Sequence, residues 1–414
     1  MKKFTIILFV LIFALPFGVF AIEEPFGDDP LDVGGKKPFL IEDRLFEVGL
    51  AHLDVFFAND FLSLTQIFQD TLKINLDDFK DGFNINFGLG ITPFYINVKS
   101  KKGWGFGFAT SVESMGVLGL SGKMLTLSEA TKELSDIGGA LFAAATISTD
   151  FKVQKFKVKV NPSLFYTLAY VKKPALTYTM SNKNGTIMYI NYDLQVYTAI
   201  PMENFGEDFN LTGTPGFDIS AGVEYPLAKE IGLTKLLPFL DFDVSLDFIN
   251  VPIVASRLKD RMRIEGSVGD KNNPIDFTDL EKSFSFNGGE VIFDSKEEIM
   301  VTRPFKMLLS ADWRPLFGSK LLTVIPVIGF SVNPIYNDVG SIEAGLNGRL
   351  SLANCFIAVL GFNYTDRMFV NSLDLALNLR AFELNLGVDI RSQDIKKSWE
   401  GAGVGVNFGL KFGW

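Results

Sequence analysis

The chain has 414 residues, of which 47% are hydrophobic, with 41 phenylalanines, 38 glycines and a formal net charge of -9. A negative charge argues against a nucleic-acid partner, because nucleic acids are held by basic side chains that neutralise phosphates. Since Cys355 is the single cysteine and His52 the single histidine, we expect no disulfide framework, no enzyme, no metal site and no cofactor.

The N-terminus is typical of a secretory signal peptide. Lys2 and Lys3 precede an apolar stretch that runs to Phe20, with Pro16 as a break and the small residue Ala21 at its end. This order of basic, apolar and small residues predicts a signal peptide over residues 1–21. The alternative, a retained anchor helix, is disfavoured by the break at Pro16.

Residues 22–100 differ from the rest of the chain and are expected to form an N-terminal plug or hatch region. Apolar side chains recur there at spacings of 4, 3, 4 and 4 from Phe57 to Leu72, which indicates an amphipathic helix. We assign to the plug and substrate pathway Phe56, Phe57, Asn59, Phe61, Leu64 and Phe68. The alternatives are a helix that stays in the periplasm, and an additional hairpin that starts with the alternating residues 83–92.

From residue 101 onward, apolar and polar residues alternate as they do in strands with two different faces. In one segment the even positions are mostly apolar: Phe156, Val158, Val160, Leu164, Tyr166, Leu168 and Tyr170. The odd positions of the same segment include three lysines, Lys155, Lys157 and Lys159. In a second segment, the apolar residues Leu240, Phe242, Val244, Leu246 and Phe248 alternate with Asp241, Asp243, Ser245 and Asp247. No apolar run after residue 21 approaches the roughly 20 residues of a membrane-spanning helix. A charge facing lipid costs about 2–4 kcal/mol for Lys or Arg, so the charged faces must line a hydrated lumen. The expected lumen charges are Lys155, Lys157, Lys159, Asp241, Asp243, Asp247, Arg349, Arg380 and Arg391.

This alternation predicts an all-β fold, a transmembrane antiparallel β-barrel of about 14 strands, with 12 to 16 possible, over residues 101–414. The expected strands are 103–115, 138–151, 155–171, 174–181, 186–199, 215–226, 238–252, 301–314, 321–333, 341–352, 355–365, 369–380, 381–391 and 401–414. A change of parity around Arg380 and Ala381 predicts a tight hairpin. The long connections 116–137, 200–214, 253–300 and 392–400 fall on one side, so we expect periplasmic termini and extracellular long loops.

The end of the chain is a strand with one apolar face. Phe408, Leu410, Phe412 and Trp414 share a parity, with glycine, Asn407 or Lys411 between them. This ending resembles the C-terminal aromatic signal by which outer-membrane barrels are recognised for assembly. The resemblance implies a bacterial outer-membrane location, with the barrel-assembly machinery and outer-membrane lipid as partners.

A barrel of fourteen strands with an N-terminal plug resembles the FadL-type transporters of long-chain fatty acids and other hydrophobic compounds. The resemblance implies a lumen blocked by the plug and an apolar entry groove. The Asn-Pro-Ala element of that family's plug is absent, the nearest residues being Phe57-Ala58-Asn59-Asp60, so substrate-binding residues do not carry over. Val48-Gly49-Leu50-Ala51 ahead of Asn59-Asp60-Phe61 also looks like barrel proteins of spirochaetes.

Three functions remain open at this point. The first is uptake of hydrophobic small molecules such as long-chain fatty acids through a plugged barrel. The second is a general diffusion porin for small polar solutes, selected by the charges of the lumen. The third is a surface adhesin or ligand-binding barrel that uses the connection 253–300. Whether the lumen is occluded separates the first two.

Overall fold

The computed structural model describes residues 45–60, 82–100, 104–126, 128–172, 176–181, 187–199, 211–268, 286–294, 297–336, 340–352, 355–379 and 381–413. Within these ranges the chain forms a closed antiparallel β-barrel of 14 strands, as the alternation predicts. The signal peptide 1–21, residues 22–44 and 61–81 of the expected plug region, Arg380 and Trp414 lie outside the described residues.

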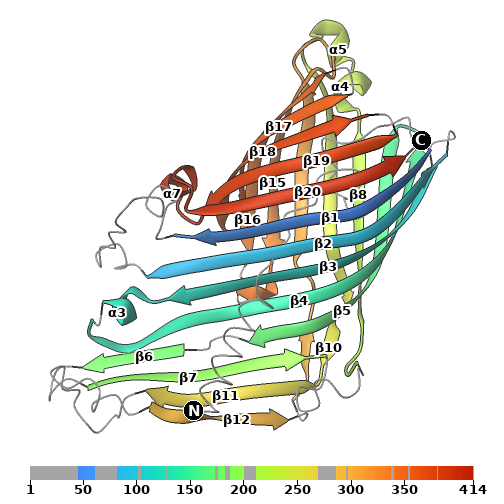
Figure 1. The fold of residues 1–414 in the computed structure, drawn as a ribbon. Helices are drawn as coiled ribbons and strands as arrows, with labels where there is room; N and C mark the ends of the chain where they lie inside the picture. The colour runs from blue at the N-terminus through green and yellow to red at the C-terminus, as the bar shows by residue number, and fades with distance from the viewer. Residues whose placement is uncertain are drawn as a thin grey trace.

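The ring of the barrel follows the order of the chain. Its strands are β1 (Phe46–Asn59), β2 (Phe83–Lys99), β3 (Trp104–Leu120), β4 (Ala130–Val153), β5 (Phe156–Lys172), β8 (Gly216–Tyr225), β9 (Asp241–Val254), β14 (Phe305–Arg314), β15 (Leu322–Val332), β16 (Ser341–Leu352), β17 (Phe356–Thr365), β18 (Met368–Asn378), β19 (Phe382–Ser392) and β20 (Gly403–Gly413). β1 pairs with β20 from Glu47 opposite Gly413 to Ala58 opposite Gly403, which closes the ring (Figure 1). Within the described ring every strand therefore has a partner on both sides, the condition for spanning a bilayer with strands.

The start of the barrel corrects the expected domain boundary. β1 and β2 are wall strands, so the barrel begins before residue 101 and Phe57 lies on a strand, not on a helix. A spacing of 4 places residues on one face of a strand as well as of a helix, so Phe57 and Phe61 fit both patterns. His52 likewise lies on β1, inside the barrel wall, where its side chain is buried.

Two of the strands expected in the ring, 174–181 and 186–199, form β-structure outside it. β5 pairs with β8 over Lys157–Phe165 and with β7 (Ile187–Thr198) over Ala169–Lys172, so the sheet branches near Leu168. Beyond the branch, β6 (Leu176–Ser181), β7, β11 (Asp260–Val268) and β12 (Phe286–Asp294) continue the wall past the barrel mouth, at the bottom of Figure 1. The expected strands 174–181 and 186–199 therefore correspond to β6 and β7 of this extension, and β11 and β12 lie within the expected loop 253–300.

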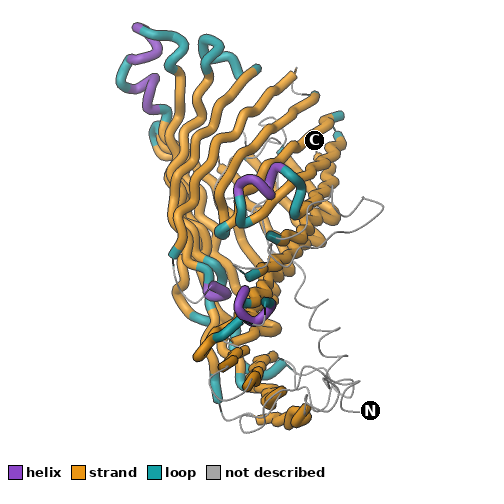
Figure 2. Tube along the Cα trace, turned by 90° about the vertical axis from the view of Figure 1, so that its left-hand side faces the viewer, coloured by secondary structure: helices purple, strands orange, loops and turns teal. Residues whose placement is uncertain are grey.

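The remaining elements are short. β10 (Ser256–Leu258) and β13 (Ile299–Val301) form a two-stranded ribbon, and Thr167 N on β5 donates to Ser256 Oγ at 3.0 Å. The helices are α3 (Gly122–Leu125), α4 (Leu227–Glu230), α5 (Leu233–Leu236), the 3-10 helix η2 (Pro334–Tyr336) and α7 (Ile395–Trp399). Figure 2 shows them at the ends of the strands, with α4 and α5 projecting at the top. In the described part of the chain, no helix has the length and apolar character needed to cross a membrane.

The two faces of the wall carry different side chains. On β9, Asp241 and Asp243 are buried on the lumen side and Leu246 is exposed on the outer side, as the alternation predicts. On β5 the expected outward position of Tyr170 is wrong. Leu168 is an extra residue between the pairs Thr167–Phe142 and Ala169–Leu141. This bulge reverses the parity, because one added residue turns every following side chain to the other face.

Candidate functional site

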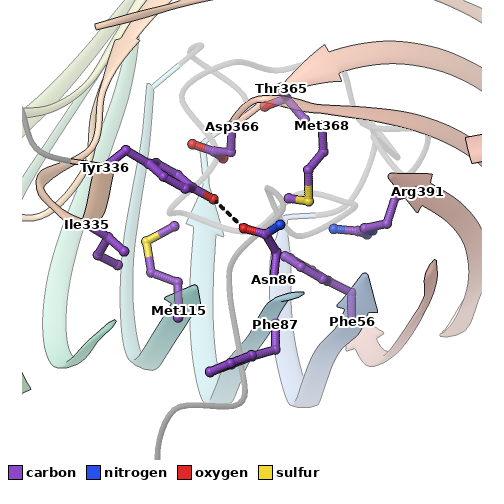
Figure 3. Close-up of a pocket in the computed structure, with 11 residues that line it drawn as sticks. Phe56, Asn86, Phe87, Met115, Ile335, Tyr336, Thr365, Asp366, Met368 and Arg391 are labelled. Carbon is purple, nitrogen blue, oxygen red and sulfur yellow. Dashed lines mark hydrogen bonds between the residues drawn. The ribbon is translucent and has the colours of Figure 1, made fainter. Parts of the chain in front are cut away.

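A small pocket lies inside the barrel, between the wall strands β1 to β3 and residues that fold in from the opposite wall (Figure 3). Its apolar lining comes from Phe56 on β1, Phe87 on β2, Met115 on β3, Ile335 on η2 and Met368 on β18. The cavity measures about 10 Å³, roughly the space of one water molecule. A larger occupant must displace side chains, and the flexible methionine side chains adapt well to such changes.

Polar groups border the pocket on one side. The hydroxyl of Tyr336 donates to Asn86 Oδ1 at 3.1 Å, drawn as the dashed line in Figure 3. Burial and the nearby Asp366 carboxylate raise the pKa of Tyr336, so the phenol stays protonated and keeps this donor role. Lys306 Nζ donates to Asp366 Oδ2 at 2.9 Å, which neutralises that carboxylate. These bonds hold the connections at Tyr336 and Asp366 in the lumen.

The pocket is one end of a longer apolar cluster. Phe142 on β4 and Phe165 on β5 meet edge to face, with 6.1 Å between ring centroids. The cluster joins the pocket residues to the β10–β13 ribbon, and its members include Phe56, Met115, Phe142, Phe165, Leu258, Val301, Ile335 and Met368. This larger apolar cluster therefore lies among the polar groups of the interior, and a second, smaller one is formed by Ile357, Val359 and Ala376 on β17 and β18.

A buried arginine fixes the link between β13 and β14. Arg303 donates to both carboxylate oxygens of Asp218 at 2.8 Å and to Glu113 Oε1 at 3.0 Å. Asp218 lies on β8 and Glu113 on β3, so one guanidinium group connects two separated parts of the wall. Two carboxylates and bidentate geometry compensate for removing the guanidinium from water.

The expected lumen charges fall into different environments. Asp241 and Asp243 are buried and pair with Arg314, which is not among the expected lumen charges. Arg391 is buried, pairs with Asp389, and its guanidinium carbon lies 3.8 Å from the centroid of the Phe56 ring. Asp247 is also buried, whereas Lys159 and Arg349 are half-buried.

The first two lysines of the expected set lie at the barrel rim. Lys155 is in the turn between β4 and β5 and pairs with Glu230 of α4. Lys157 Nζ lies 2.8 Å from Glu224 Oε1, and both side chains are partly exposed. Neither lysine faces the pocket.

The residues assigned to the plug and substrate pathway separate in the structure. Phe56 lines the pocket, whereas Phe57 is exposed on the outer face of β1. Asn59 is buried at the end of β1, and its backbone N–H donates to Ala402 O at 3.2 Å. Phe61, Leu64 and Phe68 lie outside the described residues. Of the assembly-signal residues, Phe408, Leu410 and Phe412 are less buried than their neighbours on β20, and Phe412 packs on Phe382.

The pocket residues Phe87, Met115, Ile335, Tyr336 and Met368 are missing from the sequence-based set. One signal for an apolar interior is present in the sequence: Phe165 has the same parity as Asn161, Ser163 and Thr167. An aromatic ring on an otherwise polar strand face indicates an apolar contact inside the lumen. Ile335 and Tyr336 lie between strands, where parity gives no information.

The chain resembles known proteins in three-dimensional structure but not in sequence. No protein-family model matches the chain, and no curated protein matches it. The chain is similar to the toluene transporter TbuX of Ralstonia pickettii, with 7% identity and a TM-score of 0.47 over 97% of this chain and 100% of that one. It is similar to the toluene transporter TodX of Pseudomonas putida, with 12% identity and a TM-score of 0.47 over 95% and 98% of the two chains. Both are FadL-family hydrocarbon transporters. Identities and TM-scores this low assign no function to the chain, and the resemblance to spirochaetal barrels has no support among these neighbours.

Proposed function

We propose that this chain is an outer-membrane transport protein that takes up hydrophobic small molecules, such as long-chain fatty acids, through its lumen. The observation that carries the proposal is the buried apolar cluster that includes Phe56, Met115, Phe142 and Phe165. Transfer of an alkyl or aromatic group from water to such side chains is favourable by about 25 cal/mol per Å² of apolar surface. Pockets with apolar walls and a few polar groups are typical ligand sites.

The outer face of the barrel supports the membrane location. Ile342, Leu360 and many other apolar side chains are exposed on it. Aromatic pairs lie at both rims: Phe156 with Tyr225 and Phe382 with Phe412 at the end that holds the C-terminus, and Phe362 with Trp399 at the other end. An apolar band between aromatic girdles is the pattern of transmembrane barrels.

The remaining parts of the proposal follow from this location. The signal peptide 1–21 directs export, and the barrel-assembly machinery recognises Phe408, Leu410, Phe412 and Trp414. The termini lie in the periplasm, and the extension of β6, β7, β11 and β12 faces the exterior. Residues 22–44 and 61–81 form the plug. The charges of the lumen serve structure here, because Arg303, Lys306 and Arg314 are already paired with carboxylates.

The test compares ion flow with binding of a hydrophobic compound. We expect the mature protein in planar bilayers to show no steady open-channel current. In detergent, it should bind a fluorescent polyene fatty acid and release it on addition of oleate. A steady current without fatty-acid binding would favour the porin instead. Binding of the fatty acid without a steady current would support hydrophobic uptake.

A further inference from the structure

An exposed apolar lobe lies at the barrel end that holds the C-terminus. It consists of the β8–β9 connection 226–240, with α4 and α5, and the β14–β15 turn 315–321. Ile231, Leu236 and Phe317 on this lobe are 62%, 79% and 77% exposed. The outer-wall side chains Ile342 and Leu360 are 65% and 64% exposed, so Leu236 and Phe317 are more exposed than these wall residues and Ile231 is about equally exposed.

One contact of the lobe is made on the outer side of the wall. Trp313 has the outward parity of β14, opposite Phe242 of β9, and its indole N–H donates to Phe239 O at 2.8 Å. Beside it, the rings of Phe156 and Tyr225 stack at 4.7 Å on the same rim. At Phe239 and Trp313 the lobe therefore joins the apolar outer face and its aromatic girdle.

Specific contacts hold the lobe in this place. Glu230 of α4 pairs with Lys155 in the β4–β5 turn, and Lys229 Nζ lies 3.8 Å from Asp241 Oδ2. In the second segment Gly318 has a φ of +76°, and a Cβ there would lie 2.8 Å from Asp241 Oδ2. Both segments thus lie next to Asp241, at the lumen-facing end of β9.

Basic side chains accompany the exposed apolar ones. Lys229, Lys235 and Lys320 are exposed on the two segments. An apolar surface with lysines at its border is the composition of segments that lie in a membrane interface, where alkyl groups enter the acyl boundary and ammonium groups reach lipid phosphates.

We propose that this lobe is an interfacial anchor that binds the phospholipid leaflet on the C-terminal side of the barrel. Its ligand is a lipid surface with phosphate headgroups, contacted by Ile231, Leu236 and Phe317 and by the three lysines. The inference goes beyond transport and rests on the membrane location proposed above. A soluble protein partner is the competing occupant, but the continuity of the lobe with the outer wall favours lipid.

The test places an environment-sensitive fluorophore on single cysteines in a Cys355→Ser background. Leu236→Cys and Phe317→Cys report on the lobe, Leu360→Cys on the wall, and Glu298→Cys on a partly exposed site at the opposite end of the barrel. The labelled proteins are reconstituted into vesicles of phosphatidylethanolamine and phosphatidylglycerol. Spin-labelled lipids quench the fluorophore when their nitroxide is near.

We expect at least twofold quenching at both lobe positions and at Leu360→Cys, with little at Glu298→Cys. At the lobe, a nitroxide near the headgroup should quench better than one deep in the acyl chain. Quenching at Leu360→Cys without quenching at the lobe would overturn the anchor while leaving the membrane location intact, and would indicate a soluble partner. Absence of quenching at Leu360→Cys would overturn both proposals.

A second experiment tests the lysines. The combined variant Lys229→Gln, Lys235→Gln and Lys320→Gln, labelled at Leu236→Cys, should lose at least half of the quenching that phosphatidylglycerol adds over a neutral bilayer. Unchanged dependence on the anionic lipid would remove the lysines from the binding surface.

Discussion

Phe56 and Phe57 are adjacent phenylalanines that face opposite media. Phe56 is 3% exposed and lines the pocket, whereas Phe57 is 48% exposed on the outer face. We expect Phe56→Ala to weaken binding of a fluorescent fatty acid about tenfold or more, because a buried Phe side chain contributes about 1.5–3 kcal/mol of apolar contact. Phe57→Ala is the matched control and should leave affinity unchanged. Equal losses in both variants, measured by fluorescence titration, would contradict a role for the pocket in binding.

Arg303 combines near-complete burial with two carboxylate partners. Arg303→Met leaves Asp218 and Glu113 buried without their cation, and we expect a loss of about 3–5 kcal/mol in the free energy of unfolding. Restoring neutrality with Asp218→Asn and Glu113→Gln should recover most of this loss. Lys157→Met, which breaks the partly exposed pair with Glu224, should cost at most about 1 kcal/mol. Urea titrations in detergent micelles measure all of these variants.

Each wall strand separates lipid from lumen by the parity of its side chains. Leu360 lies on the outer face of β17. Asn347 on the neighbouring strand β16 lies opposite Gly361, the residue that follows Leu360, and its side chain points inward. There Asn347 Oδ1 accepts a hydrogen bond from Asn363 Nδ2 at 3.0 Å. We expect Leu360→Arg to reduce stability in the bilayer by about 2–4 kcal/mol, the cost of a basic side chain near the midplane. Asn347→Arg faces the interior and should cost clearly less. Refolding yield in vesicles at increasing urea distinguishes them, and the reverse order would invert the assigned faces.

The strands could be predicted from the sequence where apolar and polar residues alternate within the strand itself. Parity locates β19, β20, the part of β9 up to Phe248, and the hairpin between β18 and β19, because these segments alternate without interruption. Parity does not tell whether a strand pairs inside the ring or in the extension: β6 and β7 alternate as wall strands do, yet their partners are set by the branch at Leu168. β1 was not predicted, because the four-residue spacing from Phe57 to Phe61 fits a helix as well as a strand.

The pocket was harder to predict than the wall. Phe56 and Arg391 are in the expected set, but Met115, Tyr336 and Met368 come from segments far apart in the chain. Their meeting depends on ring closure by β1 and β20 and on the connection at η2, which folds inward. A single sequence shows which face a strand residue takes, but not which residues of distant strands meet across the lumen.

As a whole, the described part of the molecule combines a closed barrel wall with an interior that contains a large apolar cluster. The wall closes without residues 22–44, since β1 begins at Phe46 and its partner β20 is complete. The role of the N-terminal segment can therefore be tested without removing a ring strand, whereas a longer deletion would take β1 with it.

Deletion of residues 22–44 should convert a closed protein into a conducting one if this segment contributes to the plug. The physical reason is steric: a barrel of 14 strands encloses a wide interior, and ions pass when nothing fills it. Single-channel recording in planar bilayers would show discrete openings in the deletion variant and none in the intact protein. Deletion of residues 261–294 in the extension is the control and should leave the current unchanged, because β9 pairs directly with β14. Steady conductance of the intact protein would assign the interior to polar solutes. Silence of both deletion variants would leave residues 61–81 as the segment that closes the lumen.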